Sequence, residues 1–167
     1  MGLLSTEAFS LKQLSQVAEQ GRLFAIIDPC DEPRAVEKLE ELGHERALCL
    51  YRKRLRAEDR DALPHIAQID DATLDWLHNT LWQEPWGVFL FADRPLRALR
   101  IPLRKLLKAL DPAGNPTYFR YYDPRVLKTF LPECSESQLL ELFDEIFAFG
   151  TSEKDSTVAV YRPSKSA

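Results

Sequence analysis

The sequence predicts an α/β fold: a single layered domain in which helices flank a mixed, mostly parallel sheet of about five strands. Short apolar runs alternate with segments that have one apolar face along the 167-residue chain, which is the pattern of such a domain. The length suits one domain, and neither a repeat nor a linker divides it. The composition, 45% hydrophobic and 29% charged, is typical of globular proteins and argues against disorder.

A helix that packs on the domain is expected within residues 1–22. Ser10 and Gln13 have the spacing of a capping box, and Gly21 supplies a stop after one apolar face. The apolar run at residues 23–27 then predicts the first buried strand.

The next helix and strand follow from an acidic cap and a glycine. Asp31 or Glu32 is expected to open a helix that ends at Gly43. A strand is expected at residues 46–51. The segment 52–61 is almost entirely charged, which predicts an exposed loop or a short helix.

The strongest strand prediction lies in the middle of the chain. Residues 65–69 are expected to form a short strand, and a helix capped by Asp70 or Asp71 follows and ends before Pro85. The run at residues 86–91 is apolar on both alternating faces, as in a central strand covered on both sides.

The C-terminal half is expected to continue the alternation. Asp93 is expected to cap a helix that Pro102 kinks or splits. A turn and a strand at residues 118–122 follow it. Two more helices are then expected, capped by Asp123 and by Ser135.

The last strand is expected at residues 157–161, before a frayed tail at residues 163–167. The α/β domain is therefore expected to span residues 23–162, preceded by the helix within residues 1–22.

Charge and processing signals argue against several protein classes. A formal net charge of −4 makes electrostatic attraction of the whole protein to nucleic acid or an anionic membrane unfavourable. The N-terminus lacks the features of a signal peptide, and no apolar run approaches the ~20 residues of a membrane span. The three cysteines show no CxxC spacing, so we expect reduced thiols and a cytoplasmic location.

The motifs of common enzymes are missing: the sequence has no phosphate-binding glycine loop, no nucleophile elbow and no zinc motif. We therefore expect no enzyme, and no catalytic, cofactor or metal site. The alternative is a small α/β enzyme or ligand-binding domain with a strand-end site around Asp28, Arg120 and Asp123, because ligands gather at the carboxyl ends of strands. For the two aspartates, capping of the following turn is the simpler interpretation.

A run of basic residues predicts a partner-facing stripe on one helix face, at three- and four-residue steps: Arg97, Arg100, Arg104 and Lys108. An acidic partner can compensate this stripe, and so can the acidic run at residues 133–145 of the same chain. Nucleic-acid binding through the stripe is a third interpretation. The acidic total and the lack of an aromatic platform beside the stripe argue against it.

One segment is more specific than the rest: residues 119–127 read Phe-Arg-Tyr-Tyr-Asp-Pro-Arg-Val-Leu. Two further motifs precede it, an apolar strand that ends at Asp28 and a Trp86–Gly87 strand followed by Asp-Arg-Pro-Leu. In order and spacing over residues 23–146, the chain resembles the adaptor chaperones of bacterial type VI secretion, whose shared domain is DUF4123. Pro29–Cys30 departs from the family pattern, which commonly has glycine and a small residue there.

The resemblance implies a cytoplasmic bacterial protein without catalytic activity, which binds a toxic effector protein and helps to load it onto the VgrG spike. Many relatives carry a further helical C-terminal lobe, so we expect this chain to bind only one of the usual partners or to need another subunit. The residues marked by the resemblance are Asp28, Trp86, Arg120, Tyr122, Asp123 and Arg125. We interpret the charged ones first as a polar network at strand ends and second as partner contacts.

Overall fold

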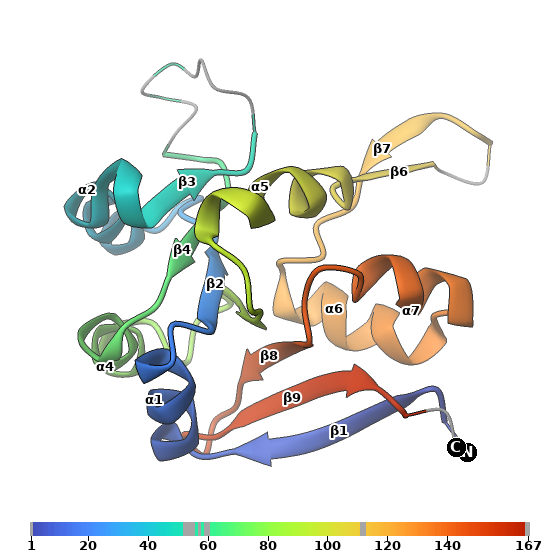
Figure 1. Cartoon of the computed structure of the whole chain (residues 1–167). Coiled ribbons are helices and arrows are strands. Elements are labelled where there is room, and N and C mark those ends of the chain that lie inside the picture. Colours follow the sequence, from blue (N-terminus) through green and yellow to red (C-terminus); the bar gives the residue numbers. More distant parts are fainter. Residues whose placement is uncertain (1, 52–55, 57, 59–60, 111–112, 166–167) are drawn as a thin grey trace.

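The computed structural model describes residues 2–51, 56, 58, 61–110 and 113–165. In this part of the chain, helices cover both faces of a seven-stranded sheet, and a two-stranded hairpin projects from one end (Figure 1). The strands of the sheet are β1 (Leu4–Phe9), β2 (Leu23–Ile27), β3 (Ala47–Cys49), β4 (His65–Gln68), β5 (Gly87–Phe91), β8 (Ala148–Ser152) and β9 (Val158–Pro163). The hairpin consists of β6 (Lys108–Leu110) and β7 (Pro116–Tyr118). The helices are α1 (Leu11–Glu19), α2 (Pro33–Arg46), α4 (Asp71–Thr80), α5 (Leu96–Lys105), α6 (Pro124–Phe130) and α7 (Glu136–Leu142), with a 3-10 turn η1 (Leu131–Glu133).

The prediction of a mostly parallel sheet of about five strands is wrong. The seven strands lie in the order β1-β9-β8-β5-β2-β4-β3, and every neighbouring pair is antiparallel. Helix α2 joins β2 to β3, and α4 joins β4 to β5, so each helix links strands of the same direction. However, β4 lies between β2 and β3, and β2 lies between β4 and β5. A strand–helix–strand pattern fixes the direction of the two strands and leaves open whether another strand lies between them.

Two strands of the seven-stranded sheet were missing from the sequence prediction. β1 carries four consecutive exposed side chains, so it has no apolar run, and residues 1–22 hold a strand as well as the predicted helix. β8 contains Gly150 and Thr151, which give the segment a polar composition, yet both are buried. A Cβ at Gly150 would lie 2.8 Å from a methyl of Val158 and 3.2 Å from Phe89, so packing against neighbouring strands explains the glycine.

The expected strand at residues 118–122 is also wrong, because only Tyr118 belongs to a strand and the chain then turns into α6. Pro95, not Asp93, is the N-cap residue of α5, and Pro102 lies inside this helix without splitting it. Gly43 does not end α2 but introduces a break, at φ 68°, before Arg46. The prediction for residues 52–61 falls mostly outside the described residues.

Four other predictions based on local caps are confirmed. Capping boxes form at Ser10 and at Ser135, and the side chains of Asp70 and Asp123 cap α4 and α6. Each of these caps joins a side chain to backbone N–H groups two or three residues away, so the local sequence is sufficient to predict it. Pro163, which was expected in the tail, still belongs to β9.

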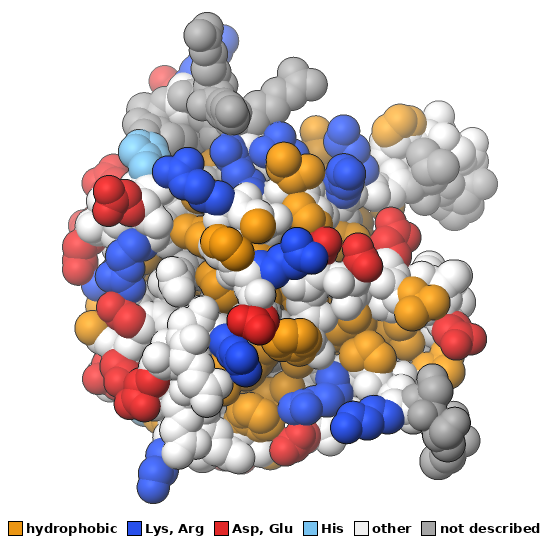
Figure 2. Space-filling model, in the orientation of Figure 1, with side chains coloured by type: hydrophobic (Ala, Val, Ile, Leu, Met, Phe, Trp, Pro, Cys, Tyr) orange, Lys and Arg blue, Asp and Glu red, His pale blue; other side chains and the backbone are white. Residues whose placement is uncertain are grey.

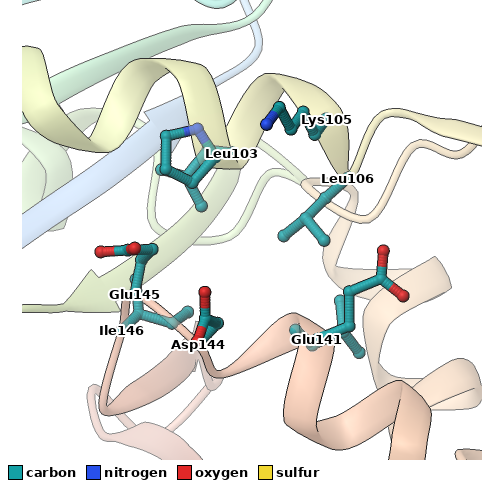
Figure 3. A pocket seen from close by; sticks show the side chains of 9 residues that line it. Leu103, Lys105, Leu106, Glu141, Asp144, Glu145 and Ile146 are labelled. Atoms are coloured by element: carbon teal, nitrogen blue, oxygen red, sulfur yellow. The ribbon is translucent and has the colours of Figure 1, made fainter.

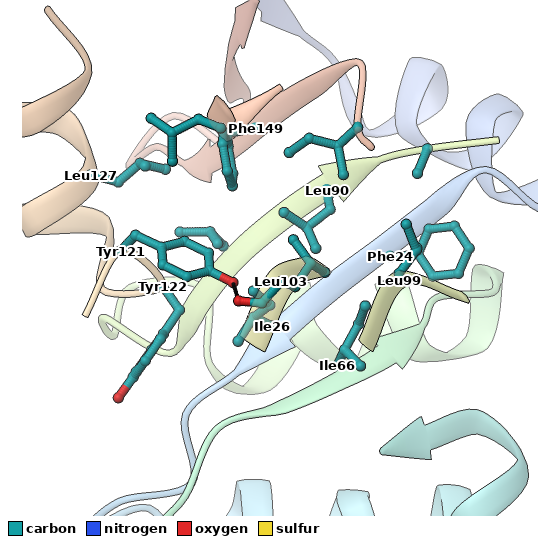
Figure 4. Close-up of a cluster of buried hydrophobic side chains, with 14 of the residues drawn as sticks. Phe24, Ile26, Ile66, Leu90, Leu99, Leu103, Tyr121, Tyr122, Leu127 and Phe149 are labelled. Atoms are coloured by element: carbon teal, nitrogen blue, oxygen red, sulfur yellow. Dashed lines mark hydrogen bonds between the residues drawn. The ribbon is translucent and has the colours of Figure 1, made fainter. Parts of the chain in front are cut away.

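Two apolar clusters form the core, one on each face of the sheet. Ile26 and Leu90 pack with α5, α6 and α7 on one face (Figure 4). Ala25 and Phe89 pack with α1, α2 and α4 on the other face. β5 is buried throughout and takes the fourth position of the seven, as predicted for the central strand. None of the described helices combines the length and apolar character that crossing a membrane requires.

Candidate functional site

The carboxyl end of β2 meets the segment before α6 through an ion pair. Asp28 directly follows β2, and its backbone N–H donates to the carbonyl of Trp86 at 2.8 Å. Its Oδ1 accepts from the N–H of Cys30 at 3.1 Å, and its Oδ2 accepts from Nη2 of Arg120 at 2.9 Å. Asp28 is therefore both a turn cap and an ion-pair partner, so the capping and the polar-network interpretations both apply to it.

Arg120 is held between Asp28 and Tyr122. Its guanidinium lies 5.6 Å from the centre of the Tyr122 ring, in cation–π geometry. Burial opposes the charge, but the neighbouring Tyr122 and Asp28 raise the pKa of Arg120 above its usual value. The side chain of Asp28 is 13% exposed and that of Arg120 is 54% exposed. The arginine thus anchors the segment and still presents half of its surface to solvent.

Asp123 and Arg125 form a separate, local pair. Asp123 Oδ1 accepts from the backbone N–H and from Nε of Arg125, at 2.9 and 3.0 Å, and Oδ2 accepts from Nη2 at 2.8 Å. The hydrogen bonds from Arg125 lower the pKa of Asp123 against the opposing effect of burial. The Asp123 side chain is therefore the N-cap of α6 and bonds to Arg125, while its backbone N–H donates to the carbonyl of Arg120 at 3.0 Å. The predicted network consequently consists of two adjacent pairs.

The Trp86–Gly87 motif has a structural explanation. Trp86 is buried, and its indole N–H donates to the hydroxyl of Ser152 at 3.2 Å. Gly87 has a φ of 149°, and a Cβ there would lie 1.9 Å from the carbonyl oxygen of Ile26. Only glycine permits β5 to approach β2 this closely at the point where Asp28 leaves the sheet.

Tyr121, which the sequence analysis did not single out as a site residue, anchors the same segment from inside. It is fully buried, and its hydroxyl donates to the carbonyl of Leu103 at 2.7 Å (Figure 4). That carbonyl lies in the last turn of α5, where helix carbonyls lack helical partners. In the strand that was expected at residues 118–122, Tyr121 and Tyr122 would lie on opposite faces. Both are instead buried in one cluster, because the chain turns there.

A hollow of about 300 Å³ opens beside the ion pair. It is lined by Asp28, Cys30, Asp31, Glu32, Glu84, Pro85, Trp86, Arg120 and Arg125. Burial and the carboxylates of Asp31 and Asp28 raise the pKa of the Cys30 thiol, which disfavours the nucleophilic thiolate. Among the described residues, no three His, Cys, Asp or Glu side chains are grouped as a metal site requires. The walls of the hollow carry carboxylates and guanidinium groups, so it offers charges of both signs for binding.

The four residues of the predicted basic stripe do not share one helix face. Lys108 lies beyond α5, in β6. Arg100 is half-buried and donates to the carbonyls of Cys49 and Tyr51, at 2.7 and 3.0 Å, so it caps the end of β3. Burial and the neighbouring Arg104 lower the pKa of Arg100. Figure 2 shows Lys and Arg side chains gathered over the upper part of the molecule, where α5 lies.

The solvent face of α5 is a different stripe, Arg97–Ile101–Lys105, with all three side chains exposed. Ile101 is 59% exposed, and Tyr118 on the adjoining hairpin is 66% exposed. Lys108 is exposed and lies directly opposite Tyr118 in the hairpin register. We call these five residues the α5–hairpin surface: Arg97, Ile101, Lys105, Lys108 and Tyr118.

The acidic run faces the end of α5 across a hollow of about 210 Å³ (Figure 3). Lys105 lines one side, and Glu141, Asp144 and Glu145 line the other. Glu145 of the acidic run forms an ion pair with Arg94, whose Nε lies 2.6 Å from its Oε2. Arg94 lies before α5 and outside the predicted stripe, so this ion pair uses none of the α5–hairpin residues, although Lys105 borders the same hollow as the acidic run.

Comparison with known protein families gives a match. The family described as "Domain of unknown function (DUF4123)" matches residues 23–141, which extend from β2 into α7 and include both ion pairs. No curated protein and no solved structure matches the chain. Because the match covers well over half of the sequence, the chain belongs to the DUF4123 family.

Proposed function

We propose that this chain is an adaptor chaperone of type VI secretion, which binds a toxic effector protein in the bacterial cytoplasm and assists its loading onto the VgrG spike. Membership of the DUF4123 family and the complete motif at residues 119–127 support this proposal. In the structure, the side chains of Arg120, Tyr121 and Asp123 in that motif form hydrogen bonds to other residues of the same chain. A protein without catalytic activity then needs a binding surface elsewhere.

The α5–hairpin surface is the docking site that we propose for the effector. It combines two exposed apolar side chains, Ile101 and Tyr118, with three cations. Aromatic and arginine side chains are enriched at protein interfaces, and an apolar centre surrounded by charges gives both affinity and orientation. The partner that fits this surface presents an apolar residue flanked by carboxylates.

Co-expression with the effector encoded beside the gene tests this function. We expect a co-purifying complex that Ile101→Asp and Tyr118→Asp each disrupt, and that weakens as salt screens the three cations. Leu140→Asp is the matched control, since Leu140 is also an exposed apolar residue, at 69%, but lies on α7. A soluble effector that never co-purifies with the wild-type chain would refute the function. Equal binding by all three variants would refute the docking site alone.

A small ligand-binding domain is the second candidate, and the hollow beside Asp28 and Arg120 favours it. Guanidinium groups and carboxylates on its walls match a zwitterion, so the twenty common amino acids are suitable probes. Under this alternative, one of them raises the unfolding temperature of the wild type and not that of Arg120→Ala. No shift with any of these probes counts against this candidate.

A further inference from the structure

β1 forms one border of the sheet, and its outer side pairs with no described strand (Figure 1). The N–H of Ser164 donates to the carbonyl of Leu3 at 2.8 Å, which fixes the direction of the hydrogen bonds along this strand. In an antiparallel ladder, the N–H and C=O of one residue point to the same side, and the side alternates along the strand. Ser5 and Glu7 therefore bond toward β9. The backbone groups of Leu4, Thr6 and Ala8 point outward from the sheet.

This border lacks the usual protection of an edge strand. Natural edges carry proline, lysine, bulges or very short strands, which prevent pairing with another chain. β1 is six residues long, pairs with β9 without a bulge, and contains neither proline nor lysine. Its single charge, Glu7, forms an ion pair with Arg162 of β9 at 3.2 Å. The strand is thus a regular, open template for a further strand.

We propose that the outer side of β1 pairs with β1 of a second copy of this chain, antiparallel and about a two-fold axis at Thr6. Leu4 then lies opposite Ala8 of the second copy, and Thr6 lies opposite its own counterpart. Each of these outward-facing pairs exchanges both of its N–H···O bonds. Ser5 lies opposite Glu7 of the second copy, on the other face of the joined sheet.

The sequence of β1 favours pairing with a second copy, because its pattern of apolar and polar residues reads the same in both directions. From Leu4 to Ala8 the residues run apolar, polar, polar, polar, apolar, so apolar meets apolar and polar meets polar about Thr6. Directly opposite residues must lie on the same face, and this register pairs even positions with even and odd with odd. Centring the pair on Glu7 instead would place two carboxylates opposite each other, which is unfavourable.

The oligomeric state of the isolated chain tests the proposal, measured by light scattering and sedimentation over a wide range of concentrations. We expect a reversible dimer. Thr6→Pro removes an outward N–H without touching the β9 ladder, so the dimer Kd should rise at least about tenfold while the circular dichroism spectrum is kept. Thr6→Ala keeps the N–H and should leave the dimer intact. A monomer at all concentrations, or a dimer that tolerates Thr6→Pro, would overturn the proposal.

Cross-linking gives a second measurement that does not depend on how Thr6→Pro folds. Opposite residues of a hydrogen-bonded pair have Cα atoms about 5.5 Å apart, within the range of a disulfide. In a background where the exposed Cys30 is replaced by serine, Thr6→Cys should form a disulfide-linked dimer on oxidation. Glu7→Cys is the matched control, because its counterpart is displaced by two residues along the strand. Equal cross-linking of the two variants, or protection of the β1 amides only when another protein is added, would contradict pairing with a second copy.

Discussion

Nη2 of Arg120 lies 2.9 Å from Oδ2 of Asp28, across 92 positions of sequence. The pair joins the end of β2 to the loop that leads into α6, so it connects the sheet with the helical layer formed by α5, α6 and α7. Two motifs that are far apart in the sequence therefore form one structural unit. Gly87 belongs to the same unit. Because it has no side chain, β5 can approach the backbone of Ile26, two residues before Asp28.

The first prediction concerns the two sides of this ion pair. Asp28→Ala removes the ion pair and the turn bond to Cys30, and should lower the free energy of unfolding by about 2 kcal/mol. Arg120→Ala should cost less, about 1 kcal/mol, because the arginine is half-exposed and solvent screens its charge. Urea unfolding measures both, with Arg97→Ala as an exposed control. A larger loss for Arg120→Ala than for Asp28→Ala would contradict this assignment.

The second prediction concerns the buried hydroxyl of Tyr121. Tyr121→Phe leaves the Leu103 carbonyl without its partner in the core, so the free energy of unfolding should fall by about 1–3 kcal/mol. Tyr118→Phe removes the same atom from an exposed side chain and should change it by less than about 0.5 kcal/mol. Thermal and urea unfolding of the two variants provide the comparison. Equal stability of the two variants would show that the hydrogen bond to Leu103 contributes nothing.

The third prediction concerns the glycine of the Trp86–Gly87 motif. In Gly87→Ala the new Cβ meets the backbone oxygen of Ile26, which cannot move without opening the β2–β5 ladder. We expect a loss of more than about 3 kcal/mol, or failure to fold. In Gly150→Ala the atoms nearest to the new Cβ belong to the side chains of Val158, Phe89 and Phe91 and not to the backbone, so the loss should be smaller. If Gly150→Ala is the more damaging change, the proposed reason for the motif is wrong.

The sequence predicted local features well and long-range pairing poorly. Ser10, Asp70, Asp123 and Ser135 are caps that act within three residues, and all four were predicted. The order of the strands depends on contacts between distant segments, and the exposed β1 carries no apolar run to reveal that it pairs with β9.

The candidate site was likewise predicted only in part from the sequence. Asp28 and Arg120 were expected in a polar network at strand ends, and the structure joins them in an ion pair. The partner of Arg100 could not be predicted, because its targets are backbone carbonyls at the end of β3, about fifty positions earlier. A backbone carbonyl has no signature in the sequence. The helical spacing of the cations therefore suggested one exposed stripe, whereas in the structure Arg100 is half-buried and Arg97 and Lys108 are exposed.

The last prediction is a pH dependence that separates the two roles of Asp123. Hydrogen bonds from Arg125 lower the pKa of Asp123 below its ordinary value of 3.8, so its charge stabilises the folded state above that pH. This contribution is lost as the pH falls through the lower pKa of the folded protein. Asp123→Asn keeps an N-cap acceptor and removes the charge, so it should be less stable than the wild type at neutral pH, and the difference should vanish in acid.

Asp123→Ala is the matched variant, because it removes the cap as well as the charge. It should lose about 1 kcal/mol through the missing cap, and that part of the loss should persist in acid, where the wild-type carboxyl still offers an acceptor oxygen. Urea unfolding of the three proteins between neutral pH and about pH 2 measures both terms. A constant difference between Asp123→Asn and the wild type over this range would mean that the charge of Asp123 adds nothing, and that its only role is to begin α6.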